Sequence, residues 1–248
     1  MAYNGWIDSH CHLCTLEDPM HELELAEQAG VDGFVTIALN RKELAFSEEI
    51  LNPNVLTFAG VHPSYSKTQN RFIQELPELI DSHIIEGIGE IGLDKRNRDI
   101  IWQREILLEQ LDIAEQYNIP VSMHCVKMYY ELYKLIKDNF PCIRGAIHGF
   151  NGSVEIIEEF SKLDIAFGIN PGILANPNLS DIVNLLIERN KLLLESDAPN
   201  THNSNFAMKT EGLQLLPYFA TEISSQTGVE LSKLKEAQLN SFKEFIAF

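Results

Sequence analysis

The chain has few cysteines and few basic residues, and it has no long apolar run. Its 248 residues include only four cysteines, too few for the disulfide framework of a small secreted domain and compatible with a reducing compartment. No apolar run reaches the ~18 residues that a membrane span needs. The first ten residues, MAYNGWIDSH, lack the basic and apolar regions of a signal peptide. The sequence therefore predicts a cytoplasmic protein without a membrane segment.

Positive charge is scarce, because 19 lysines and arginines stand against 36 aspartates and glutamates and give a formal net charge of −17. Proteins that coat nucleic acid or an anionic membrane bind through many Lys and Arg contacts with phosphate. The composition excludes that mode, so a polyanionic substrate must be held locally. The apolar share of 45% and charged share of 22% are those of an ordinary globular protein and exclude extensive disorder.

A recurring unit organises the chain, and no linker or change in composition marks a domain boundary. Short apolar runs rich in β-forming residues each end in a polar or Gly/Pro-containing segment, and a helical pattern follows. The eight runs are Gly5–Leu13, Gly33–Leu39, Val55–His62, Ile84–Leu93, Pro120–Cys125, Arg144–Phe150, Asp164–Ile169 and Lys191–Glu195. Alternating strands and helices favour a parallel sheet. Eight units in about 250 residues predict an α/β fold, a (β/α)8 TIM barrel, as a single domain over residues 1–248.

The clearest helical pattern is Trp102–Tyr117, where Leu107, Leu111 and Ala114 fall on one face. Ser180 is expected to cap a helix over Asp181–Glu188. Further helices are expected toward the end of the chain, over Leu213–Ile223 and Leu231–Ile246.

Residue types that bind metals gather at the ends of the predicted strands, namely His10, His12, His62, Glu90, Asp94, His124, His148 and Asp197. The carboxyl ends of all strands of a parallel barrel meet at one mouth, so these side chains are expected to converge. His10 and His12 are two residues apart and point to the same face, whereas Cys11 points the other way. Imidazoles with carboxylates suit zinc, manganese or iron, and a carboxylate such as Glu90 can bridge two ions. The sequence predicts a divalent metal site.

Two other patterns suggest different chemistry but lack the context that it needs. Cys11 and Cys14 form a Cys-x-x-Cys pair, but no second pair follows to complete a zinc knuckle. The segment from Gly87 to Gly92 matches G-x-G-x-x-G, yet no helix starts at its last glycine, as a dinucleotide site requires. These glycines are expected to admit closely packed neighbours within the barrel.

Taken in order, six segments resemble the TatD-type metal-dependent hydrolases, barrel enzymes of the wider amidohydrolase group. The segments are Asp8-Ser9-His10-Cys11-His12, Gly60-Val61-His62-Pro63, Gly87-Ile88-Gly89-Glu90-Ile91-Gly92-Leu93-Asp94, Pro120-Val121-Ser122-Met123-His124, His148-Gly149-Phe150-Asn151-Gly152-Ser153 and Leu192-Leu193-Leu194-Glu195-Ser196-Asp197-Ala198-Pro199. Each segment alone is a weak pattern, but six in this order are specific. The resemblance covers nearly the whole chain.

The resemblance implies two divalent metal ions per chain (Zn, Mg or Mn). It assigns one ion to His10, His12, Glu90 and Asp197, the other to Glu90, His124 and His148, and a substrate-facing place to His62. The implied activity is that of a deoxyribonuclease, often a 3′ to 5′ exonuclease. Some members of the family are credited with deacylating misacylated tRNA, so a metal-dependent ester or amide hydrolase such as an aminoacyl-tRNA deacylase remains an alternative. A metal-binding protein without turnover is a third.

The fifth segment departs from the family pattern, which commonly reads His-Ser-Arg. Here the sequence reads His124-Cys125-Val126-Lys127, and a lysine cannot form the two-pronged contact of a guanidinium. This change leaves the identity of the substrate open.

Basic residues that could hold a substrate lie just after Glu90 in the chain. Lys95, Arg96, Arg98 and Arg104 lie either in an ordinary solvated loop or in a small phosphate clamp, which Lys127 would assist. A local clamp suits a short or single-stranded nucleic acid end, or another small phosphoester. Tyr65, Tyr129 and Tyr130 are candidates for stacking on bases.

The ligand set predicts hydrolysis by a water that two cations activate, with Glu90 between them. Asp197 is the candidate general base, and His62 or a metal ion is expected to stabilise developing negative charge. No heptad seam predicts an obligate partner, so the chain is expected to be a monomer.

Overall fold

We describe a computed structural model of the chain over residues 3–50, 52–65, 70–200 and 212–247. Eight parallel strands follow one another in sequence order around a single sheet. They are β1 (Trp6–Cys11), β2 (Val31–Ala38), β3 (Val55–Ala59), β4 (Gly87–Asp94), β5 (Val121–Val126), β6 (Gly145–Ile147), β7 (Ile165–Ile169) and β8 (Leu192–Leu194). The predicted barrel fold and its eight strands are confirmed, because each strand overlaps one predicted apolar run.

Hydrogen bonds beyond the end of β8 join the last strand to the first. The backbone N–H of Asp197 donates to the carbonyl oxygen of His10 at 3.0 Å, and His12 N–H donates to the carbonyl oxygen of Ala198 at 2.9 Å. The Ser9 hydroxyl donates to the carbonyl oxygen of Leu194 at 3.0 Å. The seam that closes the barrel therefore places the segment around Asp197 beside His10 and His12, at the end of β1.

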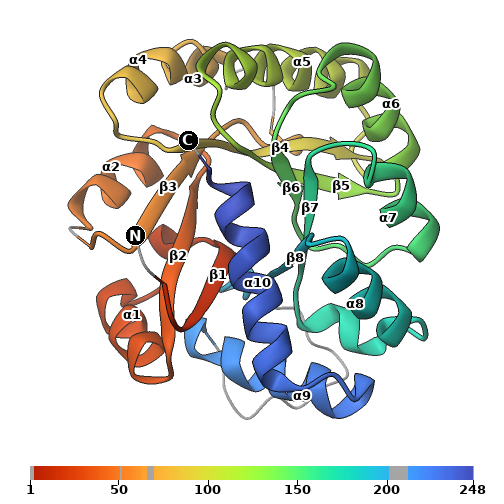
Figure 1. Cartoon of the computed structure of the whole chain (residues 1–248). Coiled ribbons are helices and arrows are strands. Elements are labelled where there is room, and N and C mark those ends of the chain that lie inside the picture. The colour runs from red at the N-terminus through yellow and green to blue at the C-terminus, as the bar shows by residue number, and fades with distance from the viewer. Residues whose placement is uncertain (1–2, 51, 66–69, 201–211, 248) are drawn as a thin grey trace.

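Helices lie around the barrel and across one of its ends, as Figure 1 shows. They are α1 (Pro19–Gln28), α2 (Arg41–Glu49), α3 (Asn70–Ile73), α4 (Leu76–Asp81), α5 (Ile100–Tyr117), α6 (Tyr129–Asn139), α7 (Val154–Phe160), α8 (Leu179–Glu188), α9 (Leu216–Thr227) and α10 (Leu231–Phe245). Short 3₁₀ turns lie at Leu13–Thr15, Pro171–Ala175 and Leu213–Leu215. No helix among the described residues is long and apolar enough to cross a membrane.

Two helices begin at other residues than predicted. The helix α5 begins at Ile100 because the Asp99 carboxylate accepts the N–H of Trp102 at 3.1 Å, an N-cap that adds half a turn to the predicted segment. The prediction of Ser180 as an N-cap was wrong. The helix α8 already begins at Leu179, after Asn178, so Ser180 lies inside its first turn.

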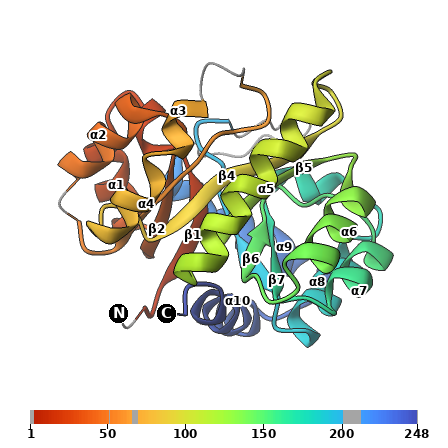
Figure 2. The same ribbon diagram turned by 90° about the horizontal axis from the view of Figure 1, so that it is seen from above.

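The last helix, α10, lies across the amino ends of the strands and closes that end of the barrel (Figures 1 and 2). Its Phe242 and Phe245 pack in one buried cluster with Ile7 and Phe58 from the barrel wall. Gln238 donates a hydrogen bond to the carbonyl oxygen of Ile7 at 2.9 Å. The opposite end of the barrel, where the strands finish, is the end at which polar side chains gather.

The glycine-rich segment lies within β4, and the next helix, α5, starts only at Ile100. Gly92 has a φ of 144°, and a Cβ there would overlap the carbonyl oxygen of His124 on β5. Only glycine allows β4 and β5 to approach this closely. The glycines of this segment therefore allow close packing within the barrel, as predicted. Cys11 packs in the outer apolar cluster and not toward the histidines.

Candidate metal centre

The mouth of the barrel brings together the seven residues predicted as metal ligands or catalytic groups. His10 and Glu90 lie within β1 and β4, His124 lies within β5, and the others lie one to three residues beyond a strand end. All seven carry side-chain nitrogen or oxygen atoms that lie close to a partner in the group. Strands far apart in sequence thus supply one cluster, as the convergence of parallel strands predicts.

The carboxylate of Glu90 lies at the centre of the cluster and meets different histidines on its two oxygens. Oε1 lies 2.6 Å from Nε2 of His148 and 2.7 Å from Nδ1 of His124. Nε2 of His62 lies 3.2 Å from the same oxygen. These short distances make Oε1 the more tightly surrounded of the two.

The other oxygen of Glu90 faces His10 of β1 and His12, which directly follows that strand. Oε2 lies 3.6 Å from Nε2 of His10 and 3.8 Å from Nε2 of His12. His12 Nε2 also lies 3.6 Å from Oδ1 of Asp197. The two oxygens therefore face two groups of nitrogen ligands, the arrangement of a carboxylate that can bridge two cations.

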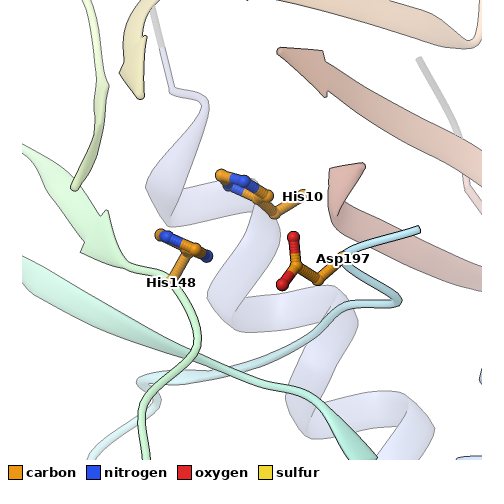
Figure 3. Close-up of side chains that lie close together, drawn as sticks. All are labelled: His10, His148 and Asp197. Atoms are coloured by element: carbon orange, nitrogen blue, oxygen red, sulfur yellow. The ribbon is translucent and has the colours of Figure 1, made fainter. Parts of the chain in front are cut away.

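Three sets of side chains offer ligand atoms within 4.8 Å of one another: His10, His148 and Asp197; His10, His12 and Glu90; and His62, Glu90 and His124. The second set contains three of the four residues that the resemblance assigns to one ion. The first, drawn in Figure 3, joins His10 and Asp197 to His148, because the rings of the two histidines stack at 3.9 Å between centroids. The cluster is compact enough for His148 to lie close both to Oε1 of Glu90 and to the ring of His10.

Buried hydroxyl and carboxylate groups orient the histidines. Ser122 Oγ lies 3.0 Å from Nδ1 of His10, so Nε2 of that ring points into the cluster. This Nε2 is buried, and no hydrogen bond to a described residue satisfies it. An imidazole fixed by its Nδ1, with a buried Nε2 aimed at carboxylates, has the disposition of a metal ligand.

Glu195 plays a corresponding role beside His148. Its Oε1 accepts the backbone N–H of Gly149 at 2.6 Å and lies 3.6 Å from Nδ1 of His148. A Cβ on Gly168 of β7 would overlap the other oxygen of this carboxylate. Glycine at position 168 therefore makes the space in which Glu195 can reach the histidine.

His62 is held differently, through hydrogen bonds that set its tautomer. The backbone N–H of Ser64 donates to Nδ1 of His62 at 3.1 Å, so the neutral ring carries its proton on Nε2. That Nε2–H faces Oε1 of Glu90. Gln110 of α5 fixes the adjacent backbone, because it accepts Val61 N–H at 2.7 Å and donates to Val61 O at 3.2 Å. These contacts present His62 as a hydrogen-bond donor to the mouth.

Electrostatics keep the central carboxyl ionised. Burial raises the pKa of Glu90, but the nearby imidazoles, His148 foremost, outweigh burial and hold the pKa well below its usual range. For His148, burial lowers the pKa, but Glu90 and Glu195 outweigh it and hold the pKa well above the usual range. For Asp197, burial raises the pKa, and the hydrogen bond from His12 with nearby imidazoles produces a net decrease. An ionised carboxylate among imidazoles suits a cation site.

The basic residues predicted to hold substrate fall into two groups. Lys95, Arg98 and Lys127 are exposed, and no ion pair joins any of them to another described residue. The N–H of Lys95 donates to the carbonyl oxygen of Val126 at 3.1 Å, which places the loop after β4 beside the residue that precedes Lys127. Arg96 differs, because its guanidinium is paired with Asp94.

Arg104 is also paired and is not available to a phosphate clamp, since it forms an ion pair with Glu131 of α6. The predicted stacking residue Tyr65 lies beside the cluster, with its ring centroid 6.3 Å from that of His62. Tyr129 packs edge-on against Phe150 instead. Of the three tyrosines named from the sequence, Tyr65 is the one in ring contact with a residue of the metal cluster.

Reasoning from the sequence missed the residues that orient the ligands. Ser122 and Glu195 lie within the six segments that carry the family resemblance, but neither was given a role. Asp94 was counted among the strand-end carboxylates without its partner. A signal was present for Glu195, because a charged residue directly after the all-apolar run Leu192–Leu194 in a buried strand needs a polar partner.

Comparison with known proteins identifies the class. A family model described as TatD related DNase matches residues 7–247, so the chain belongs to this family. The protein YjjV of Escherichia coli (strain K12), described as an uncharacterized metal-dependent hydrolase, is 28% identical over 213 residues, 81% of this chain and 82% of YjjV. The crystal structure of YjjV matches with a TM-score of 0.83 at 25% identity, covering 97% of both chains.

Relatives with a more specific description also match. A protein of Pantoea vagans (strain C9-1) named 3′-5′ ssDNA/RNA exonuclease TatD is 28% identical over 191 residues, 73% of this chain and 74% of that protein. The Escherichia fergusonii protein of the same name is 31% identical over 179 residues, 69% of each chain. The predicted family and the predicted class, a metal-dependent hydrolase that acts on ester bonds, are confirmed.

Proposed function

We propose that the chain is a phosphodiesterase that removes nucleotides from single-stranded nucleic acid ends with two divalent cations. The observation that carries the proposal is the division of ligands by Glu90, whose Oε1 faces His124 and His148 while Oε2 faces His10 and His12. In this assignment, one ion is held by His10, His12, Glu90 and Asp197, and the other by Glu90, His124 and His148. Imidazole and carboxylate ligands accept Zn, Mn and Mg to different degrees, so availability selects the ion.

The residues of the mouth have complementary roles in the proposed reaction. Bound cations at such a site lower the pKa of water and neutralise charge on a phosphoryl oxygen. Asp197, ionised and partly exposed at the mouth, accepts the proton of the attacking water. The Nε2–H of His62 donates to an oxygen on which negative charge develops. Glu90 holds the two halves of the site at a fixed separation.

The substrate class follows from the small number of lysines and arginines that lie at the mouth without an ion-pair partner, among the residues that the structure describes. A duplex-coating enzyme would need many lysines and arginines, but the mouth offers Lys95, Arg98 and Lys127 on a chain of net charge −17. Three phosphates held this way predict a shallow salt dependence, about −0.7 per phosphate on a log–log scale for a single strand. Tyr65 beside His62 supplies a ring for a terminal base. The relatives named 3′-5′ ssDNA/RNA exonuclease support this class of substrate.

The test compares single-stranded DNA labelled at its 3′ or its 5′ end with a misacylated tRNA, each with metal-reconstituted protein and with Asp197→Asn. The proposal expects mononucleotides to leave the 3′ end, with no release by the variant. Release of amino acid from the tRNA without DNA cleavage would identify the carbonyl-ester hydrolase instead. Metal binding without either reaction would favour a protein that binds metal without turnover.

We expect the chain to act as a monomer, because its ligand set comes entirely from one barrel. Size-exclusion chromatography with light scattering tests this. A mass near the 28.1 kDa of the chain is the expected result, and a dimer whose dissociation abolished metal binding would contradict it.

A further inference from the structure

Asp94, at the end of β4, lies between a histidine of the metal centre and an arginine of the surface. Its side chain is 2% exposed, and its Oδ2 lies 3.2 Å from Nε2 of His124. Its backbone is fixed by Gln103 of α5, which accepts Asp94 N–H at 2.7 Å and donates to Asp94 O at 3.1 Å. The carboxylate is therefore held at one place, against the edge of the His124 ring that faces away from Glu90.

Arg96 occupies the other side of the same carboxylate. Its Nε lies 3.0 Å from Oδ1 and 3.0 Å from Oδ2, and one terminal nitrogen donates to Oδ2 at 2.6 Å. Its backbone N–H donates to Oδ1 at 2.8 Å. This is the two-pronged contact at which arginine is most effective, and it uses the edge of the guanidinium that would otherwise grip a phosphate.

We propose that Arg96 is a positioning residue of the metal centre and not part of a phosphate clamp. Arg96 holds the Asp94 carboxylate, Asp94 accepts the Nε2–H of His124, and the lone pair of Nδ1 is thereby directed toward Glu90. The inference rests on the proposed two-cation site, since it assigns Arg96 to the half of that site that contains His124 and His148.

The physical reason is the tautomer of His124. A neutral imidazole has one N–H and one lone pair. Both nitrogens of His124 face carboxylates, since Oδ2 of Asp94 lies 3.2 Å from Nε2 and Oε1 of Glu90 lies 2.7 Å from Nδ1. A cation held by Glu90 would take the lone pair of Nδ1, which leaves the proton on Nε2, where Asp94 accepts it. A buried carboxylate that lost Arg96 would lack most of its donors and would shift to recover them, which would release the ring.

The sequence grouped Arg96 with Lys95 and Arg98 because the three lie close together in the chain. In the structure, Arg98 is exposed and forms no ion pair with another described residue, whereas Arg96 makes three side-chain hydrogen bonds to Asp94. Arg98 is therefore the matched control, two residues away in the same loop and of the same type. Substitution of Arg96 is expected to weaken metal binding, whereas substitution of Arg98 is expected to weaken substrate binding.

The experiment titrates Zn²⁺ into metal-free wild type, Arg96→Gln, Arg96→Lys and Arg98→Gln by calorimetry with a competing chelator. The same proteins are then assayed at saturating Zn²⁺ for KM and its salt dependence on single-stranded DNA. Arg96→Gln is expected to weaken one of the two binding steps by about 10- to 100-fold, the usual effect of removing a group that orients a metal ligand. Its KM and salt slope should match wild type. Arg98→Gln should bind Zn²⁺ as wild type does, with a higher KM and a slope shallower by about 0.7.

Arg96→Lys keeps the positive charge but not the two-pronged guanidinium contact. Partial recovery of Zn²⁺ affinity in this variant would support the role of Arg96 in positioning Asp94. Wild-type Zn²⁺ binding by Arg96→Gln, or a salt slope that falls as it does in Arg98→Gln, would overturn the inference. Failure of the proposed function is distinguishable, because it would appear as fewer than two Zn²⁺ per chain in the wild type itself. Circular dichroism of the metal-free proteins verifies that all four are folded.

Discussion

Nε2 of His148 lies 2.6 Å from Oε1 of Glu90, although one residue follows β6 and the other lies within β4. The strand between them, β5, contributes His124 to the same oxygen. The curvature of the closed barrel favours contacts across two strands, because the same strands in a flat sheet would lie about 10 Å apart. The metal centre is thus a property of the closed fold, and each prediction below perturbs one of its parts.

Asp197→Asn should leave the fold intact and reduce turnover by about 100-fold or more, because an amide cannot accept the proton of the attacking water. The measurement is the rate of nucleotide release from single-stranded DNA by protein purified free of host nucleases. Asp138→Asn, at an exposed aspartate of α6, is the control and should keep the wild-type rate. A wild-type rate for Asp197→Asn would remove Asp197 from the role of base.

His62→Ala should lower kcat by about 100- to 1000-fold while the protein still binds two cations, because His62 presents a proton and not a lone pair to the mouth. Metal content and kcat are measured on the same sample. Loss of an ion together with activity would show instead that His62 is a ligand.

Gly168→Ala should destabilise the protein by about 1–3 kcal/mol, because the new methyl group overlaps the carboxylate of Glu195. Urea unfolding of the metal-free protein measures the effect. In a Glu195→Ala background the same change should cost much less, since the overlap is gone. Equal costs in both backgrounds would mean that Gly168 and Glu195 do not interact as described.

Glu86→Gln should flatten the pH dependence of stability on the acidic side. Burial raises the pKa of Glu86 above its usual value, and the hydrogen bond from Thr57 N–H at 2.8 Å offsets this in part. A folded-state pKa above the unfolded one means that the folded protein binds more protons in that interval. The contribution is present below the unfolded pKa and is lost as pH rises through the folded one.

Urea unfolding of metal-free wild type and Glu86→Gln at several pH values isolates this contribution. The stability of the wild type relative to the variant should fall as pH rises. A difference that grew with pH would give the opposite sign and contradict the raised pKa.

The sequence was sufficient to predict the barrel and the convergence of the ligands. Strand periodicity located all eight strands, and the parallel arrangement alone placed His10, His124 and Asp197 at one mouth. Alternation along β1 also predicted that Cys11 faces away from the histidines, and Cys11 packs in the outer core. These features depend on local pattern and topology, which a sequence displays directly.

The contacts that orient the ligands could not be predicted in this way. Ser122 contacts His10 from the neighbouring part of the barrel, on β5. Asp94 pairs with Arg96 and not with Lys95 or Arg98, and only the folded structure shows which of these basic residues is its partner. The start of α8 was misplaced because Ser180 is a good capping residue, whereas the helix begins at Leu179 after Asn178, whose side chain makes no cap hydrogen bond. Side-chain pairing across strands leaves no periodic signal.

The central claim is that Glu90 lies between two cation sites, and the most direct test is the number of ions bound per chain. Metal analysis after equilibrium dialysis against Zn²⁺ or Mn²⁺ should find two ions in the wild type and at most one in Glu90→Gln, whose amide offers only one oxygen as a ligand. One ion or none in the wild type, or two in a folded Glu90→Gln, would contradict the account.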